Sequence, residues 1–221
     1  MLNKLFTVVY YTSNREDEAF ERKIRANLLK VCGDIPIISV SQKSIRLGTN
    51  INVGEHEACN HNLFRQIQIG CKIADTPFVI SAEADTLYTP DYFKFIPNNI
   101  DECYKCSHTF ILNEWGKGQY SGFYRKEVGA FAQITGRLHL IKEIENVLKG
   151  KPIWGKRRNR KKERPLELFR RRRWKLFYIK NPVVSVKTGK GMDKHTKIIE
   201  PPVDAIPYWG NACRLREELF K

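Results

Sequence analysis

The sequence predicts an α/β protein whose mostly parallel sheet is covered by helices on both faces. Two observations indicate this class: three short apolar segments are typical of strands, and two amphipathic segments with helical spacing separate them. The hydrophobic content of 42% over 221 residues is ordinary for a globular protein with one well-filled core. The expected architecture is therefore one domain whose largely parallel sheet is built through helical crossovers.

The first strand and helix are predicted over residues 4–13 and 13–33. Ser13 and Glu16 have the spacing of a capping box, so the helix is expected to begin at Ser13, and Gly33 is expected to end it. One apolar face of this helix consists of Phe20, Ile24, Leu28 and Val31.

The second strand is predicted over residues 35–41, followed by a polar loop that contains Gly48 and Gly54. Helical spacing resumes over residues 56–75, and residues 76–85 return as an apolar strand. Crossovers of this kind are right-handed and make the strands parallel, so their carboxyl ends meet at one edge of the sheet. Ligands of such sheets bind at that edge.

Two carboxylates, Glu83 and Asp85, lie one residue apart at the end of the last of these strands. Side chains at alternate positions of a strand point the same way, so two negative charges are expected in one small volume. Such a pair can hold Mg²⁺ or Mn²⁺, which in turn binds the diphosphate of a nucleotide. The alternative is a pair of solvated loop acids. A short helix after Thr89 would place both carboxylates beside the end of the first strand.

Positive charge is concentrated in residues 156–175. The chain carries a net charge of +15, and this segment holds twelve Lys or Arg against two Glu, which is 12 − 2 = +10. A block of this kind meets a polyanion or an anionic membrane surface, or is a solvated insertion. Aromatic side chains among and beside the cations suit both base stacking and lipid headgroups: Trp154, Phe169, Trp174, Phe177 and Tyr178.

The cysteines and the hydropathy profile predict a cytoplasmic protein. The six cysteines are scattered along the sequence, which is typical of free thiols in a reducing compartment. No apolar run approaches the roughly 20 residues that a membrane span needs, and the N-terminal residues do not resemble a signal peptide. Cys103 and Cys106 have C-x-x-C spacing with His108 nearby, and Cys59 lies between two histidines. A structural zinc site is therefore an alternative to plain packed thiols.

Residues 64–93, FRQIQIGCKIADTPFVISAEADTLYTPDYF, resemble the helix and D-x-D strand of GT-A glycosyltransferases, with Glu83-Ala84-Asp85 as a variant of the motif. The resemblance covers about residues 5–95. It implies a GT-A (Rossmann-like) fold in one domain over residues 1–221, with a nucleotide-sugar-binding half at 1–95 and an acceptor-side half at 96–221. A P-loop and a G-x-G-x-x-G after a strand are both missing from the sequence, which disfavours kinases, simple NTPases and dinucleotide-binding enzymes.

The resemblance also implies site residues. The nucleobase and ribose would be surrounded by Tyr11, Thr12, Ser13 and Arg15, and the phosphates would contact Arg65 and Lys190. The metal ligands would be Glu83, Asp85 and, from a glycine-rich loop, His195. Residues 120–131 would form a strand, a turn at Gly122 and a helix that starts at Glu127. The candidate catalytic bases are Glu127, Glu163 and Glu167.

For the acceptor, the favoured hypothesis is a hydroxymethylated base in DNA, as in phage DNA-modifying glycosyltransferases, which would act in the cytoplasm of the host. The DNA would be bound by Arg157, Arg158, Arg160, Lys161, Lys162, Arg170, Arg171, Arg172, Arg173 and Trp174. One alternative is a peripheral glycosyltransferase of surface glycan or lipid synthesis, whose basic segment rests on anionic lipid. The other is a non-catalytic protein that binds nucleic acid.

Overall fold

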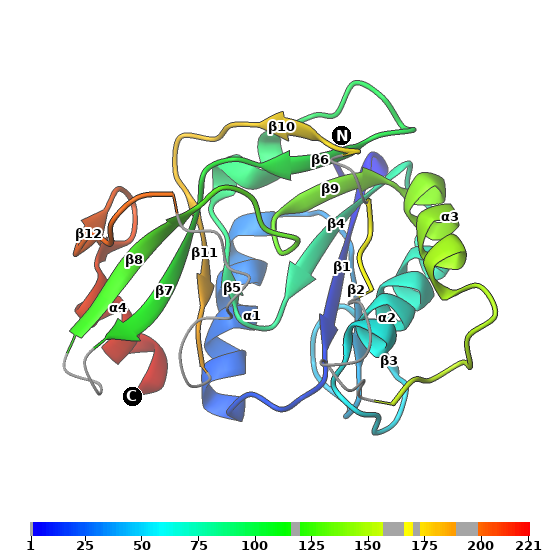
Figure 1. Cartoon of the computed structure of the whole chain (residues 1–221), viewed down its shortest axis with the longest axis horizontal. Coiled ribbons are helices and arrows are strands. Elements are labelled where there is room, and N and C mark those ends of the chain that lie inside the picture. Colours follow the sequence, from blue (N-terminus) through cyan, green and yellow to red (C-terminus); the bar gives the residue numbers. More distant parts are fainter. Residues whose placement is uncertain (1, 116–119, 157–165, 170–172, 189–198) are drawn as a thin grey trace.

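The computed structural model describes residues 2–115, 120–156, 166–169, 173–188 and 199–221. A large sheet occupies the middle of the molecule, and a smaller sheet lies beside it (Figure 1). The α-helices of the described residues are α1 (Glu18–Cys32), α2 (Asn60–Ile73), α3 (Arg137–Leu148) and α4 (Ala212–Phe220), with short 3₁₀ helices at Leu2–Lys4 and Pro90–Lys94.

The large sheet has the order β10-β6-β9-β4-β1-β2-β3 among the described residues. Its strands are β1 (Phe6–Thr12), β2 (Ile37–Ser41), β3 (Thr49–Asn52), β4 (Phe78–Glu83), β6 (Cys103–Cys106), β9 (Gln133–Gly136) and β10 (Lys175–Phe177). All neighbouring pairs are parallel except the two that involve β9. This arrangement confirms the predicted mixed, mostly parallel sheet.

The smaller sheet has the order β5-β11-β7-β8. Its strands are β5 (Thr86–Leu87), β7 (Thr109–Trp115), β8 (Tyr120–Lys126) and β11 (Val183–Val186), and a separate hairpin pairs β12 (Ala205–Ile206) with β13 (Gly210–Asn211). Helix α4 packs against β8 and α1, so the C-terminal part of the chain covers the smaller sheet (Figure 1).

Both faces of the large sheet are buried. Phe6, Val8 and Tyr10 of β1 pack on one face with α1, whereas Val9 and Tyr11 pack on the other face with α2 and α3. Figure 1 shows α2 and α3 together on one side of the sheet. This alternation explains why β1 is apolar at every position instead of every second one.

Helix α1 confirms the predicted apolar face but not the predicted start. The side chain of Asp17 caps the helix by accepting a hydrogen bond from the backbone N–H of Phe20 at 3.0 Å. The capping box expected from Ser13 and Glu16 is therefore wrong, because Asp17 offers the same cap closer to the apolar face. Gly33 ends the helix with a φ of +60°, as predicted.

Two other segments differ from the sequence-based expectations. The predicted loop around Gly48 contains β3, a polar edge strand whose register pairs it with β2. Gly122 lies inside β8 instead of forming a turn, and no helix begins at Glu127, where the chain leaves β8 and turns toward β9. Apolar spacing alone misses both features, since β3 is not apolar and a glycine inside a strand reads as a turn.

No helix in the described part of the chain is both long and apolar enough to span a membrane.

The close approach of α2 to β1 depends on Gly70. A Cβ atom at this position would lie 2.5 Å from Cγ1 of Val9. We expect Gly70→Ala to lower the free energy of unfolding by about 1–3 kcal/mol through overpacking, although alanine ordinarily stabilises a helix relative to glycine by about 1 kcal/mol. Urea unfolding measures the change. In a Val9→Ala background the same substitution should cost less, and a stabilised single variant would contradict the packing argument.

Candidate functional site

The site lies where the strand order of the large sheet reverses, between β1 and β4. From β1 the chain proceeds to β2 and β3 on one side and returns to β4 on the other, so the loops at the carboxyl ends of β1 and β4 diverge and leave a crevice. The two strands are parallel, with Tyr11 paired to Glu83. The hydroxyl of Tyr11 donates a hydrogen bond to Oε1 of Glu83 at 2.8 Å.

Asp85 lies in the tight turn between β4 and β5. Its backbone carbonyl accepts a hydrogen bond from the N–H of Val186 at 2.7 Å, and its Oδ1 accepts one from the hydroxyl of Thr86 at 3.1 Å. The backbone N–H of Glu83 donates a hydrogen bond to the hydroxyl of Tyr88 at 3.2 Å. The end of β4 and the turn that follows it, which together carry the two acids, are thus held by the large sheet and by β11 of the smaller sheet.

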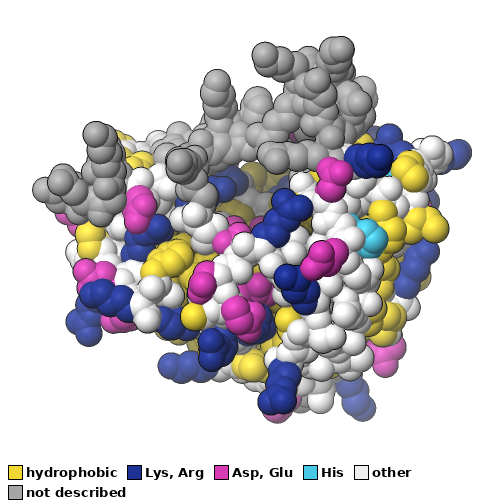
Figure 2. Space-filling view, turned by 90° about the horizontal axis from the view of Figure 1, so that it is seen from below, with side chains coloured by type: hydrophobic (Ala, Val, Ile, Leu, Met, Phe, Trp, Pro, Cys, Tyr) yellow, Lys and Arg dark blue, Asp and Glu magenta, His cyan; other side chains and the backbone are white. Residues whose placement is uncertain are grey.

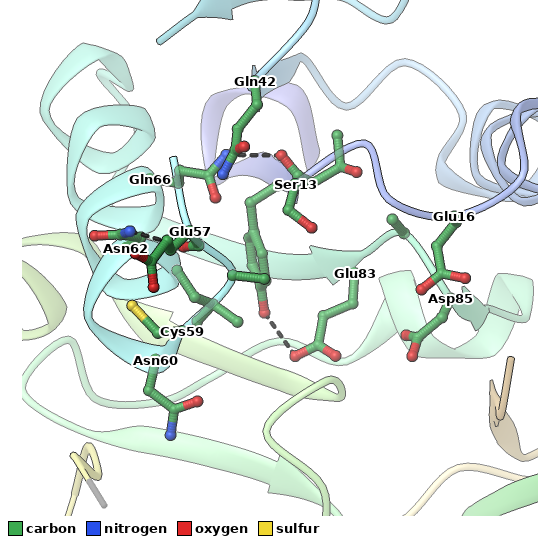
Figure 3. Close-up of a pocket in the computed structure, with 15 residues that line it drawn as sticks. Ser13, Glu16, Gln42, Glu57, Cys59, Asn60, Asn62, Gln66, Glu83 and Asp85 are labelled. Carbon is green, nitrogen blue, oxygen red and sulfur yellow. Dashed lines mark hydrogen bonds between the residues drawn. The ribbon is translucent and has the colours of Figure 1, made fainter. Parts of the chain in front are cut away.

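A first cavity of about 300 Å³ opens at this edge. It is lined by Tyr11, Thr12, Ser13, Glu16, Gln42, Glu57, Ala58, Cys59, Asn60, Asn62, Leu63, Gln66, Glu83, Ala84 and Asp85. Figure 3 shows Glu16 and Asp85 toward one end of the group and Gln42, Gln66 and Asn62 toward the other. The described lining contains four carboxylates and no Lys or Arg.

The acid pair is held in an environment that disfavours negative charge. Burial raises the pKa of Glu83, against a hydrogen bond from Tyr11 and the charges of Lys126 and Lys187. Burial and the neighbouring charge of Glu83 raise the pKa of Asp85 to about 7. Two carboxylates so close together in a poorly solvated site ionise reluctantly unless a cation joins them.

Two lysines of the smaller sheet act on the acid pair. Lys126 ends β8, and Lys187 directly follows β11. Burial and the charge of Lys187 lower the pKa of Lys126, whereas Glu83 and Asp85 act in the opposite direction. Neither lysine can be predicted from the sequence, because both lie far from the acids along the chain and only the contact between the two sheets brings them together.

The loop between β1 and α1 is pinned to β2. Asn14 adopts a left-handed conformation with a φ of +49°, and its Oδ1 accepts hydrogen bonds from the N–H groups of Gln42 at 2.9 Å and Lys43 at 2.8 Å. Asparagine tolerates this conformation better than most residues. In Figure 3 the carboxyl group of Glu16, two residues later, points toward that of Asp85.

Figure 2 looks onto this edge of the molecule, from below Figure 1. Asp and Glu side chains gather in the middle of the face, and Lys and Arg side chains surround them. The acidic centre and basic surroundings agree with the lining of the first cavity and with the positions of Lys126 and Lys187 beside it.

A second cavity of about 520 Å³ adjoins the first, and the two share Tyr11, Asn60, Leu63 and Glu83. Its remaining lining consists of Phe64, Ile67, Lys105, Ala130, Gln133, Leu166, Glu167, Leu168, Phe169 and Trp174. Residues 166–169 and Trp174 of the basic segment are thereby brought to the same site as Glu83.

The structure places some of the predicted site residues together and others apart. Tyr11, Thr12 and Ser13 line the first cavity, and Glu167 and Trp174 line the second. Arg15 is exposed and lines neither.

Arg65 is turned away from both cavities, contrary to its expected place at the diphosphate. Its Nε donates to the carbonyl of Ile153 at 3.0 Å, and its Nη1 donates to Oε1 of Gln68 at 2.7 Å. Helical position accounts for this, because Arg65 and Gln68 lie on the face of α2 that meets the segment after α3. Glu127 also lines neither cavity.

Several predicted residues lie outside the described part of the chain. They are Lys190 and His195 of the glycine-rich loop, the candidate base Glu163, and Arg157, Arg158, Arg160, Lys161, Lys162, Arg170, Arg171 and Arg172 of the basic segment. Of the predicted DNA-binding residues, the structure describes Arg173, which is exposed, and Trp174.

The C-x-x-C pair does not form a zinc site. Cys103 packs on the α2 face of the large sheet and Cys106 on the α1 face, because residues three apart on a strand point in opposite directions. His108 is hydrogen-bonded through Nδ1 to the carbonyl of Ile179 at 2.9 Å. Among the described residues, no three His, Cys, Asp or Glu side chains gather as metal ligands would.

No family model matches the chain, and no curated protein matches its sequence. Among solved structures it is similar to HddC from Yersinia pseudotuberculosis, with 14% identity and a TM-score of 0.44 over 82% of this chain and 93% of that one. It is also similar to a glycosyltransferase involved in the glycosylation of the major capsid of PBCV-1, with 12% identity and a TM-score of 0.40 over 66% of each chain.

A third similar structure is the bifunctional IspDF from Campylobacter jejuni, with 11% identity and a TM-score of 0.41 over 67% of this chain and 45% of that one. The match therefore spans less than half of the bifunctional protein and just under two thirds of the PBCV-1 glycosyltransferase. Similarities of this degree assign no activity to the chain.

The raised pKa of Asp85 predicts a pH-dependent stability. The unfolded carboxyl ionises near pH 3.9 and the folded one near pH 7, so in chelator this residue makes the protein less stable as the pH rises between these values. Asp85→Asn should raise the free energy of unfolding at pH 8 by roughly 1–2 kcal/mol after allowance for solvent screening, with a smaller gain toward pH 4. Denaturant unfolding at several pH values measures this.

The matched control is Asp75→Asn, an exposed acid that precedes β4 at the opposite edge of the sheet. Because Asp75 lines neither cavity, Asp75→Asn should not reproduce the gain in stability at pH 8. A gain for Asp85→Asn that is the same at pH 8 and pH 4 would contradict the assigned pKa.

Proposed function

We propose that the protein is a glycosyltransferase of the GT-A type, which transfers a sugar from a nucleoside-diphosphate sugar to an acceptor hydroxyl. The observation that carries this proposal is the acid pair Glu83 and Asp85 at the strand-order switch, between a cavity of nucleotide size and a second cavity. The resemblance of residues 64–93 to the D-x-D strand of GT-A enzymes supports it.

The acid pair suits Mn²⁺ or Mg²⁺. Within the described part of the chain, Oε2 of Glu83 and Oδ2 of Asp85 accept no hydrogen bond, so each carboxylate keeps one oxygen for a cation. Mg²⁺ is typically held by one or two carboxylates together with substrate phosphates and water, which is the donor set that this site offers. When bound, the cation would neutralise charge on the diphosphate leaving group. His195 is proposed as a further ligand from the glycine-rich loop.

The remaining roles follow from position. Tyr11, Thr12 and Ser13 would contact the nucleoside in the first cavity. Lys126 and Lys187, whose charges act on Glu83, would stabilise the negative charge that develops on the departing diphosphate.

The acceptor would occupy the second cavity. Glu167 and Glu83 both line it, so an acceptor hydroxyl placed there lies between the donor site and a carboxylate base. We therefore propose Glu167, in preference to Glu127, as the group that removes the proton from the attacking hydroxyl.

The favoured acceptor is DNA with a hydroxymethylated base. The backbone of Gly155 exchanges two hydrogen bonds with the side chain of Asn62, at 2.7 and 2.9 Å, and the carbonyl of Leu166 accepts one from Asn60 at 3.1 Å. Because both asparagines line the first cavity, the basic segment leaves and rejoins the described structure at the rim of the site. Its net charge of +10 would therefore be available to bind the phosphates of an acceptor strand.

The decisive assay is release of nucleoside diphosphate from a panel of nucleotide sugars with Mn²⁺, with and without hydroxymethylcytosine-containing DNA. Release stimulated by this DNA would support donor and acceptor together. If added DNA does not change the release of nucleoside diphosphate, the proposed glycosyltransferase activity would still hold, and the acceptor would be a glycan or lipid. No release from any donor would refute the proposed activity and favour a non-catalytic nucleic-acid-binding protein.

In the same assay, Asp85→Asn should reduce turnover by at least about 100-fold, because it removes a carboxylate that binds the cation beside the leaving group. The native circular dichroism spectrum should be retained. Asp75→Asn, the same substitution at the other edge of the sheet, should leave turnover within about twofold of wild type. Full turnover in Asp85→Asn would refute the assigned site.

The basic segment is tested by reversing charge at Arg170, Arg171, Arg172 and Arg173 to Glu. DNA binding should weaken, and the slope of log affinity against log salt should become shallower by about one for each phosphate that the variant no longer neutralises. Fluorescence anisotropy at several salt concentrations measures both. An unchanged affinity and slope would remove the segment from the acceptor site.

A further inference from the structure

The face of β10 next to the second cavity carries aromatic rings that are fixed from beneath. Leu176 is paired in register with Lys105 of β6, so their side chains share one face of the sheet. Trp174 and Tyr178 directly precede and follow β10, each two residues from Leu176. Phe177 points to the opposite face of the sheet, where its ring stacks on that of Phe95 with centroids 4.0 Å apart. Leu176 and Tyr178 are exposed by 59% and 66%.

Trp174 is held by a buried cation. The ammonium group of Lys105 lies 4.2 Å from the centroid of the Trp174 ring, and Lys105 itself is buried. No described carboxylate lies within ion-pair distance of Lys105, so the indole face is its main described partner. A cation over one face fixes the ring in orientation.

Tyr178 is supported in the same way by a histidine. Its ring stacks on His108 with centroids 4.9 Å apart and an interplanar angle of 14°. His108 is buried and anchored to the carbonyl of Ile179, so it cannot turn away without losing that hydrogen bond. Tyr178 nevertheless remains two-thirds exposed, so a large part of a pre-oriented ring faces solvent.

Cations surround these rings. Arg173, Lys175 and Lys180 are all exposed and alternate with or follow the aromatic positions. Three acids are nearby: Glu102 pairs with Lys175 at 3.1 Å, Glu167 acts on Lys105, and Glu200 acts on His108. Along an extended strand, Trp174 and Tyr178 are separated by about 13 Å, which gives two stacking positions on one track.

From this arrangement we infer that the face of β10 formed by Trp174, Leu176 and Tyr178 binds single-stranded nucleic acid and guides it into the second cavity. Unpaired bases offer planar faces to aromatic rings, and the phosphates of the same strand meet the flanking cations. Bases inside a duplex are already stacked and offer no such face. Because the rings of Trp174 and Tyr178 are held flat against a neighbouring group, they are better placed to stack on another planar ring than to insert among lipid acyl chains. The inference rests on the proposed function only in treating the bound strand as the acceptor.

The test measures binding of a single-stranded oligonucleotide of about 16 nucleotides by fluorescence anisotropy at fixed salt. Tyr178→Ala should weaken binding about tenfold, because it removes one stacking platform. Tyr178→Phe keeps the ring and should bind like wild type. Tyr208→Ala is the matched control, since Tyr208 is a similarly exposed tyrosine, 51% accessible, near the separate β12–β13 hairpin. The effect of Tyr178→Ala on a duplex of the same sequence should be under about twofold.

Wild-type affinity of Tyr178→Ala for the single strand, with a native circular dichroism spectrum, would overturn the inference. So would a loss of co-sedimentation with phosphatidylglycerol-containing vesicles in this variant without any loss of oligonucleotide binding, because the surface would then be a lipid site. Binding does not require turnover. If Tyr178→Ala weakens oligonucleotide binding while the wild-type protein cleaves no nucleotide sugar, the inferred binding surface is supported and only the proposed transferase activity is refuted.

Discussion

The parallel pairing of β1 with β4 is the constraint on which the site depends. Because these strands run in the same direction with Tyr11 opposite Glu83, their ends and the loops that follow diverge at one edge of the sheet. A shift of one residue in this register would turn Glu83 to the other face and separate it from the Tyr11 hydroxyl. Gly70 contributes to the same constraint, since only a residue without a Cβ lets α2 approach Val9 of β1 this closely.

The electrostatics of the site follow from contact between the two sheets. The large sheet supplies the carboxylates and the smaller sheet supplies Lys126 and Lys187, so opposite charges approach from different layers. The acids are buried enough to resist ionisation, and the lysines offset only part of that cost. Under the proposed function, a cation and a phosphate-bearing ligand bound at this site would stabilise the folded protein.

Helix α2 connects the two cavities with the chain at Gly155 and Leu166. Asn60 and Asn62, in its first turn, hold the backbone at Leu166 and Gly155 and line the first cavity at the same time. The chain between these two anchors carries much of the positive charge of the protein. Trp174, directly before β10, lines the second cavity together with Glu83, so the aromatic face of β10 begins beside the acid pair.

The sequence by itself determined five elements of the first half of the chain and their order. Apolar runs and helical spacing located β1, α1, β2, α2 and β4, and the acids after β4 marked the edge where the site lies, because local periodicity reports which face of an element is buried. Only the tertiary structure decided which distant residues meet there. Lys126, Lys187 and Lys105 join the site through strand pairing across the chain, Arg65 is turned away by its place on α2, and the C-x-x-C cysteines are split between opposite faces of the sheet. These outcomes depend on strand order and register, which are set by long-range pairing and not by local spacing.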